Sequence, residues 1–176
     1  MSIQKQLLSI LEGLPKQVHL VAVSKTKPNA DIEEAYAAGQ RIFGENKIQE
    51  MTQKWETLPK DIQWHMIGNV QTNKVKYMAP YVSLIHGVDR YKLLKEINKQ
   101  AAKSDRVIDC LLQMHIAQED SKFGFNKEEL QAVVIDLKTN PLPHIRIKGL
   151  MGMATFTDNQ DQIRSEFKTL KQQFDW

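Results

Sequence analysis

The sequence is poor in the residues that build covalent or metal-bound frameworks. It has a single cysteine, Cys110, so no internal disulfide can form, and the apolar run around Cys110 predicts a buried, inert thiol. There is no Cys-x-x-Cys pair and no His-Glu-x-x-His motif. His65, His86 and His115 fall in predicted strands, but residue type alone does not make a metal site. We therefore expect no metal.

Long hydrophobic runs and blocks of one charge are also missing. No apolar stretch is long enough to cross a bilayer, and segment 1–14 mixes glutamine, lysine and glutamate with leucine instead of forming a signal-peptide core. Basic and acidic residues are interleaved at a formal net charge of +3, which gives little reason to expect a nucleic-acid or membrane partner. The glycine-rich loops of nucleotide sites are absent as well. These absences predict a cytoplasmic protein.

The chain alternates short apolar runs with segments of helical periodicity. Runs rich in apolar or β-branched residues predict six strands, at His19–Ser24, Ile42–Gly44, Gln63–Ile67, Val82–His86, Val107–His115 and Ile145–Met153. Helical patterns separate them at Ile3–Leu14, Asp31–Ala38, Lys47–Leu58 and Arg90–Lys103, and two further helices are predicted to begin at Asn126 and Thr157. This alternation is typical of a parallel sheet built from βα units.

The predicted fold class is α/β, and a (β/α)8 TIM-barrel type with an extra N-terminal helix is one architecture that fits the alternation. Six βα units are present in the sequence, whereas a closed barrel of this type has eight. The last helical stripe includes Phe174 and is still running when the sequence stops at Trp176, without a glycine or proline signal. If the fold is a barrel, residues 1–176 form a single domain truncated at its C-terminus. An open six-stranded doubly wound sheet is the alternative architecture.

A lysine follows the first predicted strand directly, and Pro28 then forces the chain to turn. Strand alternation places Val21, Val23 and Lys25 on one face, which in a barrel would send Lys25 into the mouth at the carboxyl ends of the strands. A lysine that is desolvated there offers a neutral amine, the form that attacks an aldehyde to make a Schiff base. The alternative is a lysine that extends into solvent. Lys27 is the second candidate.

Five ordered strings carry a resemblance to a known family. They are Ala22–Pro28 (AVSKTKP), Phe43–Glu50 (FGENKIQE), Trp64–Lys74 (WHMIGNVQTNK), Ser121–Phe125 (SKFGF) and Gly149–Met153 (GLMGM). Together they span nearly the whole chain, and their order and spacing resemble the pyridoxal phosphate homeostasis protein family. Members of that family are single-domain relatives of the barrel domain of bacterial alanine racemases.

The resemblance implies a cofactor and a set of residues that hold it. In the family, the lysine that corresponds to Lys25 carries pyridoxal 5'-phosphate as a covalent aldimine, and the protein serves in homeostasis of the cofactor. Asn46 is implied as a contact of the cofactor ring or its hydroxyl, although an asparagine there could instead cap the next helix. His65 in the third predicted strand and Met151 at the end of the sixth are further candidate contacts, because of their positions near the barrel mouth. Their alternatives are a hydrogen-bonded strand histidine and a core-filling methionine.

The family's phosphate anchor lies in a seventh and an eighth strand, whose Gly-Met-Ser and Arg-(Ile/Val)-Gly motifs are not found in this sequence. The resemblance therefore favours a (β/α)8 barrel whose single domain, residues 1–176, is truncated at its C-terminus. The alternative is a molecule that binds the cofactor weakly and folds with exposed strand edges.

The sequence leaves functions of other classes open. An amino-acid racemase or decarboxylase that depends on pyridoxal phosphate is the alternative to a non-enzymatic carrier or regulator. A two-base racemase needs a proton donor on the ring face opposite the lysine, and the four tyrosines fall in helical or connecting patterns, away from predicted strand ends. A nucleic-acid module is a third hypothesis, prompted by the sequence pI of about 8.9. We expect a monomer whose partners are the cofactor and enzymes that require it.

Overall fold

The computed structural model describes residues 2–118 and 123–176. Its centre is a six-stranded sheet in which every neighbouring pair is parallel and the strands follow the order of the chain. The strands are β1 (Ala22–Val23), β2 (Ile42–Glu45), β3 (Gln63–Met66), β4 (Leu84–Val88), β5 (Ile108–Met114) and β6 (Ile145–Gly152). All six predicted strands are therefore confirmed. Of the five strings, Ser121–Phe125 lies partly outside the described residues.

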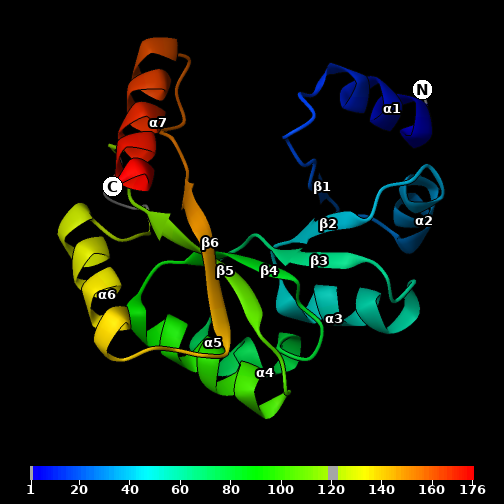
Figure 1. Ribbon diagram of the computed structural model, residues 1–176. Helices are drawn as coiled ribbons and strands as arrows, with labels where there is room; N and C mark the ends of the chain where they lie inside the picture. The colour runs from blue at the N-terminus through cyan, green and yellow to red at the C-terminus, as the bar shows by residue number, and fades with distance from the viewer. Residues whose placement is uncertain (1, 119–122) are drawn as a thin grey trace.

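The sequential strand order decides the architecture. A doubly wound sheet reverses direction beside a central strand and carries helices on both faces. When each strand pairs with the next one along the chain, right-handed crossovers place the connecting helices on one face and the sheet curls toward a barrel. Figure 1 shows the curled sheet with helices beneath it. The barrel-type prediction is confirmed, and the doubly wound alternative is wrong.

Helices connect the strands as the apolar stripes predict. They are α1 (Ile3–Gly13), α2 (Asn29–Ala37), α3 (Ile48–Thr57), α4 (Val75–Met78), α5 (Tyr91–Lys103), α6 (Lys127–Thr139) and α7 (Gln160–Asp175), with a 3-10 turn, η1 (Thr72–Lys74), before α4. Asn126 forms the predicted capping box with Glu129 at the start of α6. The cap of α7 was predicted wrongly. Asn159, not Thr157, accepts the hydrogen bonds from the first-turn amides, because Thr157 binds the Asn159 amide instead.

The hydrophobic core lies between the helices and one face of the sheet. Trp64 and Phe43 from the strands and Met51 and Leu94 from the helices are fully buried there. Cys110 is also buried, as predicted, and burial raises the pKa of its thiol to about 12, so the thiolate does not form at neutral pH.

None of the described helices has the length and apolar composition that a bilayer crossing requires.

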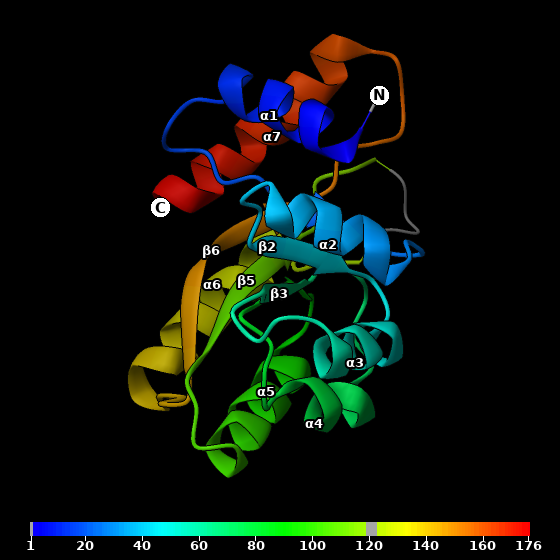
Figure 2. The same cartoon turned by 90° about the vertical axis from the view of Figure 1, so that its right-hand side faces the viewer.

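The edge strand β1 is shorter than predicted, whereas the other edge strand, β6, matches its predicted range to within one residue. Only Ala22 and Val23 of the predicted strand His19–Ser24 pair with a neighbour, because β1 is an edge strand with a single partner, β2. At the other edge α7 packs on β6. Figure 2 shows both chain termini on the side of the molecule away from α4 and α5. In the middle of the sheet, β4 continues past His86 to Val88 through an irregular register.

Candidate functional site

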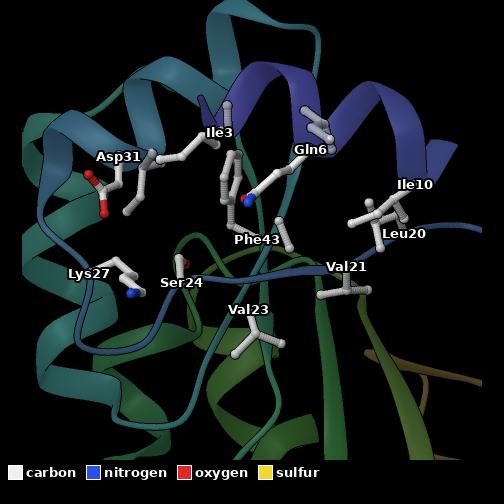
Figure 3. Close-up of a pocket in the computed structure, with 14 residues that line it drawn as sticks. Ile3, Gln6, Ile10, Leu20, Val21, Val23, Ser24, Lys27, Asp31 and Phe43 are labelled. Carbon is white, nitrogen blue, oxygen red and sulfur yellow. The ribbon is translucent and has the colours of Figure 1, made fainter. Parts of the chain in front are cut away.

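The strand register defines the face of the sheet that is opposite the helices, here called the lumen face. Phe43 and Trp64 pair across β2 and β3 and point into the core. Their neighbours Gly44 and His65 also pair, and alternation places them on the lumen face with Val23, the partner of Gly44 in β1. Figure 3 shows Val23 on the opposite side of the β1 backbone from Phe43.

Lys25 lies at the carboxyl end of β1, two residues after Val23. Its side chain is exposed and belongs to a turn, not to the regular strand. The desolvation expected for this lysine is therefore not found, because the chain leaves the sheet at Ser24 before it reaches Lys25. The placement of Lys25 beside the carboxyl ends of β1 and β2 agrees with the prediction.

The residue before Lys25 is held by buried groups. Ser24 is buried, its backbone amide donates to the carbonyl oxygen of Gly44 (3.0 Å), and its hydroxyl donates to Oε1 of Glu45 (2.6 Å). Its carbonyl oxygen accepts a hydrogen bond from the ammonium group of Lys54 on α3 (2.8 Å). Ser24 is thus fixed by all three of its polar groups.

The Lys54 ammonium group also forms two ion pairs. It lies 2.8 Å from Oε1 of Glu45 and 2.7 Å from Oε1 of Glu50. Hydrogen bonding to Lys54 is the main reason that the pKa of Glu50 lies below its ordinary value. Glu50 in turn accepts a hydrogen bond from the backbone amide of Thr26 (2.6 Å). Residues on both sides of Lys25 are therefore tethered to one buried cluster.

Asn46 follows β2 at the level of the β1 turn. Oδ1 of Asn46 is buried and has no hydrogen-bond partner among the described residues. The alternative role as a helix cap is wrong, because Lys47 is the N-terminal cap residue of α3 and no side chain makes the cap hydrogen bond. A buried acceptor without a donor costs free energy. It suits a site that receives a donor from a bound molecule.

Glycines bring the loops after β2 and β3 close to each other and to the end of β4. A Cβ atom on Gly68 would lie 2.7 Å from Cα and 2.8 Å from Cβ of Asn46, and one on Gly87 would lie 2.9 Å from the carbonyl oxygen of Gly68. No side chain of any kind fits at Gly68 without a backbone shift. The glycines therefore fix the position of Asn46 relative to the neighbouring strand ends.

His65 forms a pair with His86 on the lumen face. Nδ1 of His65 lies 3.0 Å from Nε2 of His86. Burial, and then the neighbouring His86 ring, lowers the pKa of His65 to about 4, and burial lowers the pKa of His86 as well. Both rings are thus neutral at pH 7.

The described residues contain no group of three or more His, Cys, Asp or Glu side chains that could hold a metal ion.

Lys27 lies in different surroundings from Lys25. It lines a groove of about 440 Å³ between α1, β1 and α2, together with Gln6, Ser24 and Asp31. Figure 3 shows Lys27 close to Ser24 and below Asp31 in this groove, whose lining does not include Lys25. The structure therefore separates the two lysine candidates.

Met151 is half-buried near the end of β6. Its neighbour Gly152 faces α7, because a Cβ there would lie 2.9 Å from the Leu170 side chain. Alternation then assigns Met151 to the lumen face, in register with Gln113 of β5. In the order of the sheet, β2 to β5 lie between Met151 and the β1 turn, so strand pairing does not bring Met151 beside Lys25.

Sequence reasoning missed the buried cluster of Glu45, Glu50 and Lys54. One signal was available, since Lys54 comes three residues after Met51 and four before Leu58, both on the buried stripe of α3. A lysine at a core-facing position predicts a buried partner.

Comparisons with known proteins agree on one family. The family model described as "Alanine racemase, N-terminal domain" matches residues 2–176. A pyridoxal phosphate homeostasis protein of Aquifex aeolicus is 38% identical over 154 residues, which is 87% of this chain and 67% of the relative. The protein of the same name from Haemophilus influenzae is 35% identical over 161 residues, 90% of this chain and 67% of the relative.

Solved structures share the fold. PipY of Synechococcus elongatus, with PLP bound, is 34% identical with a TM-score of 0.82, over 98% of this chain and 84% of PipY. An alanine racemase from E. faecalis has a TM-score of 0.76 at 15% identity, over 98% of this chain and 48% of the racemase. At that identity, the similarity to the racemase concerns the fold alone.

Proposed function

This chain belongs to the family of the alanine racemase N-terminal domain and, within it, to the pyridoxal phosphate homeostasis proteins, and on that basis we propose that it binds pyridoxal 5'-phosphate covalently through Lys25. The observation that carries the proposal is the position of Lys25, an exposed lysine on a tethered turn at the carboxyl end of β1. A relative of the same fold has PLP bound. Active sites of barrels gather at this end of the strands.

The chemistry requires a neutral amine at Lys25. Nζ of Lys25 attacks the aldehyde carbon, a C=N bond forms, and the aldehyde oxygen leaves as one molecule of water, which gives a Schiff base. The bound cofactor supplies the reactive aldehyde and an aromatic ring with a phosphate group. Since Lys25 is exposed, the attachment can form and reverse from solvent, which suits a protein that stores and releases a cofactor.

The residues around the turn fit a bound ring. Oδ1 of Asn46, buried and without a partner among the described residues, is proposed to accept a hydrogen bond from the ring hydroxyl. His65 is proposed to border the site from the lumen face as a neutral ring paired with His86. Its partner in β2 is Gly44, two residues before Asn46. Met151 is proposed as a further contact, because alternation along β6 places it on the lumen face as well.

We propose a role in homeostasis of the cofactor, without catalytic turnover. The names of the relatives support this role. A monomer in the cytoplasm that exchanges the cofactor with enzymes requiring it completes the proposal. The alternative is an amino-acid racemase or decarboxylase, and the fold shared with alanine racemases is what favours it. Incubation of the loaded protein with L-alanine tests this: the carrier predicts no chirality change or decarboxylation above the rate with free cofactor.

The attachment is tested by absorbance. The protein is incubated with pyridoxal phosphate, desalted, and its visible spectrum is recorded beside those of the Lys25→Ala and Lys27→Ala variants. The expected result is a retained cofactor band in the parent and in Lys27→Ala, and none in Lys25→Ala. An equal band in all three proteins would contradict the proposal, because it would place the cofactor elsewhere.

A further inference from the structure

We propose that Lys54 is a positioning residue, whose buried ammonium group fixes the turn that carries Lys25. The inference rests on the proposed function, since it concerns attachment of the cofactor at that lysine. Lys54 lies on α3, away from the lumen face, and the attachment chemistry does not use its amine.

The Lys54 ammonium group is fully saturated with hydrogen bonds. Its side chain is 7% exposed, and its three N–H groups donate to the carbonyl oxygen of Ser24, to Glu45 and to Glu50 at 2.7 to 2.8 Å. The Glu45 side chain is 0% exposed. Burying such an ion pair costs much of the attraction that it gains, and an apolar residue at the same place is often equally stable. Stability alone therefore does not account for a lysine at this position.

What the cluster specifies is the backbone around Lys25. Lys54 binds the carbonyl oxygen of Ser24, and Glu50, held by Lys54, binds the amide of Thr26. The Lys25 side chain projects from between these two anchors and stays exposed. The backbone is thus fixed while the amine remains accessible.

Thr26 shows that the turn needs such anchors. Its φ of 63° lies in the left-handed region, which is unfavourable for a β-branched residue. A conformation of this kind persists where surrounding contacts over-determine it. The hydrogen bond from the Thr26 amide to Glu50 is such a contact, and Glu50 is itself oriented by Lys54. Loss of the cluster would free the turn and move the Lys25 amine relative to Asn46.

The test compares two cluster variants with controls on the same helix. Lys54→Met removes the ammonium group, and its control is Met51→Ala, which weakens the core without touching the cluster. Glu50→Ala removes the acceptor of the Thr26 amide, and its control is Glu56→Ala at an exposed position of α3. Each protein is loaded with pyridoxal phosphate at a temperature where circular dichroism shows it folded. Cofactor affinity and the borohydride-trapped lysines are then measured.

We expect both cluster variants to bind the cofactor at least about tenfold more weakly, because attachment depends on the placement of the reacting atoms. The trapped label should also shift from Lys25 toward other lysines, and the Thr26 amide should exchange its hydrogen faster without cofactor. The controls should keep the parent affinity and the parent labelling of Lys25, although Met51→Ala lowers the melting temperature. A merely structural role would lower the melting temperature without moving the label.

The outcomes separate the two proposals. Parent-like affinity and labelling of Lys25 in folded Lys54→Met would overturn the role of Lys54 and leave the proposed function standing. If Lys54→Met does not fold, Glu50→Ala decides in the same way, since the Glu50 side chain is 24% exposed and its loss is better tolerated. A parent protein that carries no label on Lys25 would overturn the proposed function, and this inference with it.

Discussion

At the carboxyl end of β1, an exposed lysine stands between two residues that are tethered to buried groups. Ser24 and Thr26 are held by Lys54 and Glu50, whereas Lys25 itself is open to solvent. This arrangement combines a defined backbone with an accessible amine. The sequence predicted the position of Lys25 from strand alternation, but it left a desolvated and a solvent-exposed side chain open, because the choice depends on where the chain leaves the sheet.

Asn46 provides a prediction that separates binding from stability. Because Oδ1 of Asn46 has no partner among the described residues, Asn46→Ala should change the free energy of unfolding by no more than about 0.5 kcal/mol. If the cofactor ring donates a hydrogen bond to this oxygen, the same variant should bind the cofactor about threefold to tenfold more weakly. Urea unfolding and a cofactor titration measure the two effects. Unchanged affinity would remove Asn46 from the proposed site.

Gly68 tests the close approach of the loops beside Asn46. A methyl group there would meet the Asn46 backbone, so Gly68→Ala should destabilise the fold by about 1 to 3 kcal/mol. The matched control is Gly13→Ala at the end of α1, where a Cβ would have no neighbour within 4 Å. The control should be neutral or slightly stabilising. Equal unfolding midpoints in urea for the two variants would contradict the packing described for the strand ends.

At the scale of elements, strands β3 and β4 are joined on the lumen face by the pair of His65 and His86. Burial holds both rings neutral, and the pKa of His65 lies at about 4, below the 6.5 of an unfolded chain. Between these values the unfolded state binds more protons than the folded state. Stability is therefore complete above pH 6.5 and falls as the pH is lowered toward 4, by about 1 to 3 kcal/mol.

This pH dependence is measured as the free energy of unfolding between pH 7 and 5. His65→Gln should show a smaller loss than the parent over this range, and His19→Gln, at an exposed position, should match the parent. The depressed pKa of Glu50 acts in the same direction, but only below its ordinary value of 4.5, so it leaves this range undisturbed. A parent-like slope in His65→Gln would mean that His65 is not buried in its neutral form.

The elements differed in how well their sequences predicted them. The helix α5 was clear, because Leu93, Leu94, Ile97 and Ala101 form one buried stripe. The short helix α4 and the turn η1 were missed, since four residues are too few to show a helical period. The strand β1 was predicted too long, because apolar residues flank its two paired positions whether or not a neighbouring strand binds them. Pairing is a tertiary property.

At the scale of the whole molecule, the order of the strands could be predicted only as one of two possibilities. Alternating strands and helices suit both a barrel and a doubly wound sheet, and the choice depends on pairing between strands. The five ordered strings favoured the barrel through the family they resemble. The buried stripe of α3 gave a signal for the burial of Lys54, but its partners could not be predicted, because Ser24, Glu45 and Glu50 come from the turn after β1, from β2 and from α3 and meet only in the folded chain. The single-domain organisation stays a prediction.

The most direct test of the account is to identify the lysine that carries the cofactor. The protein is incubated with pyridoxal phosphate, reduced with borohydride, digested, and mapped by mass spectrometry, with Lys25→Ala treated in parallel. The account predicts that the label lies mainly on Lys25 and that Lys25→Ala carries only scattered, substoichiometric label. A label mainly on Lys27, or one spread evenly over exposed lysines in both proteins, would contradict it.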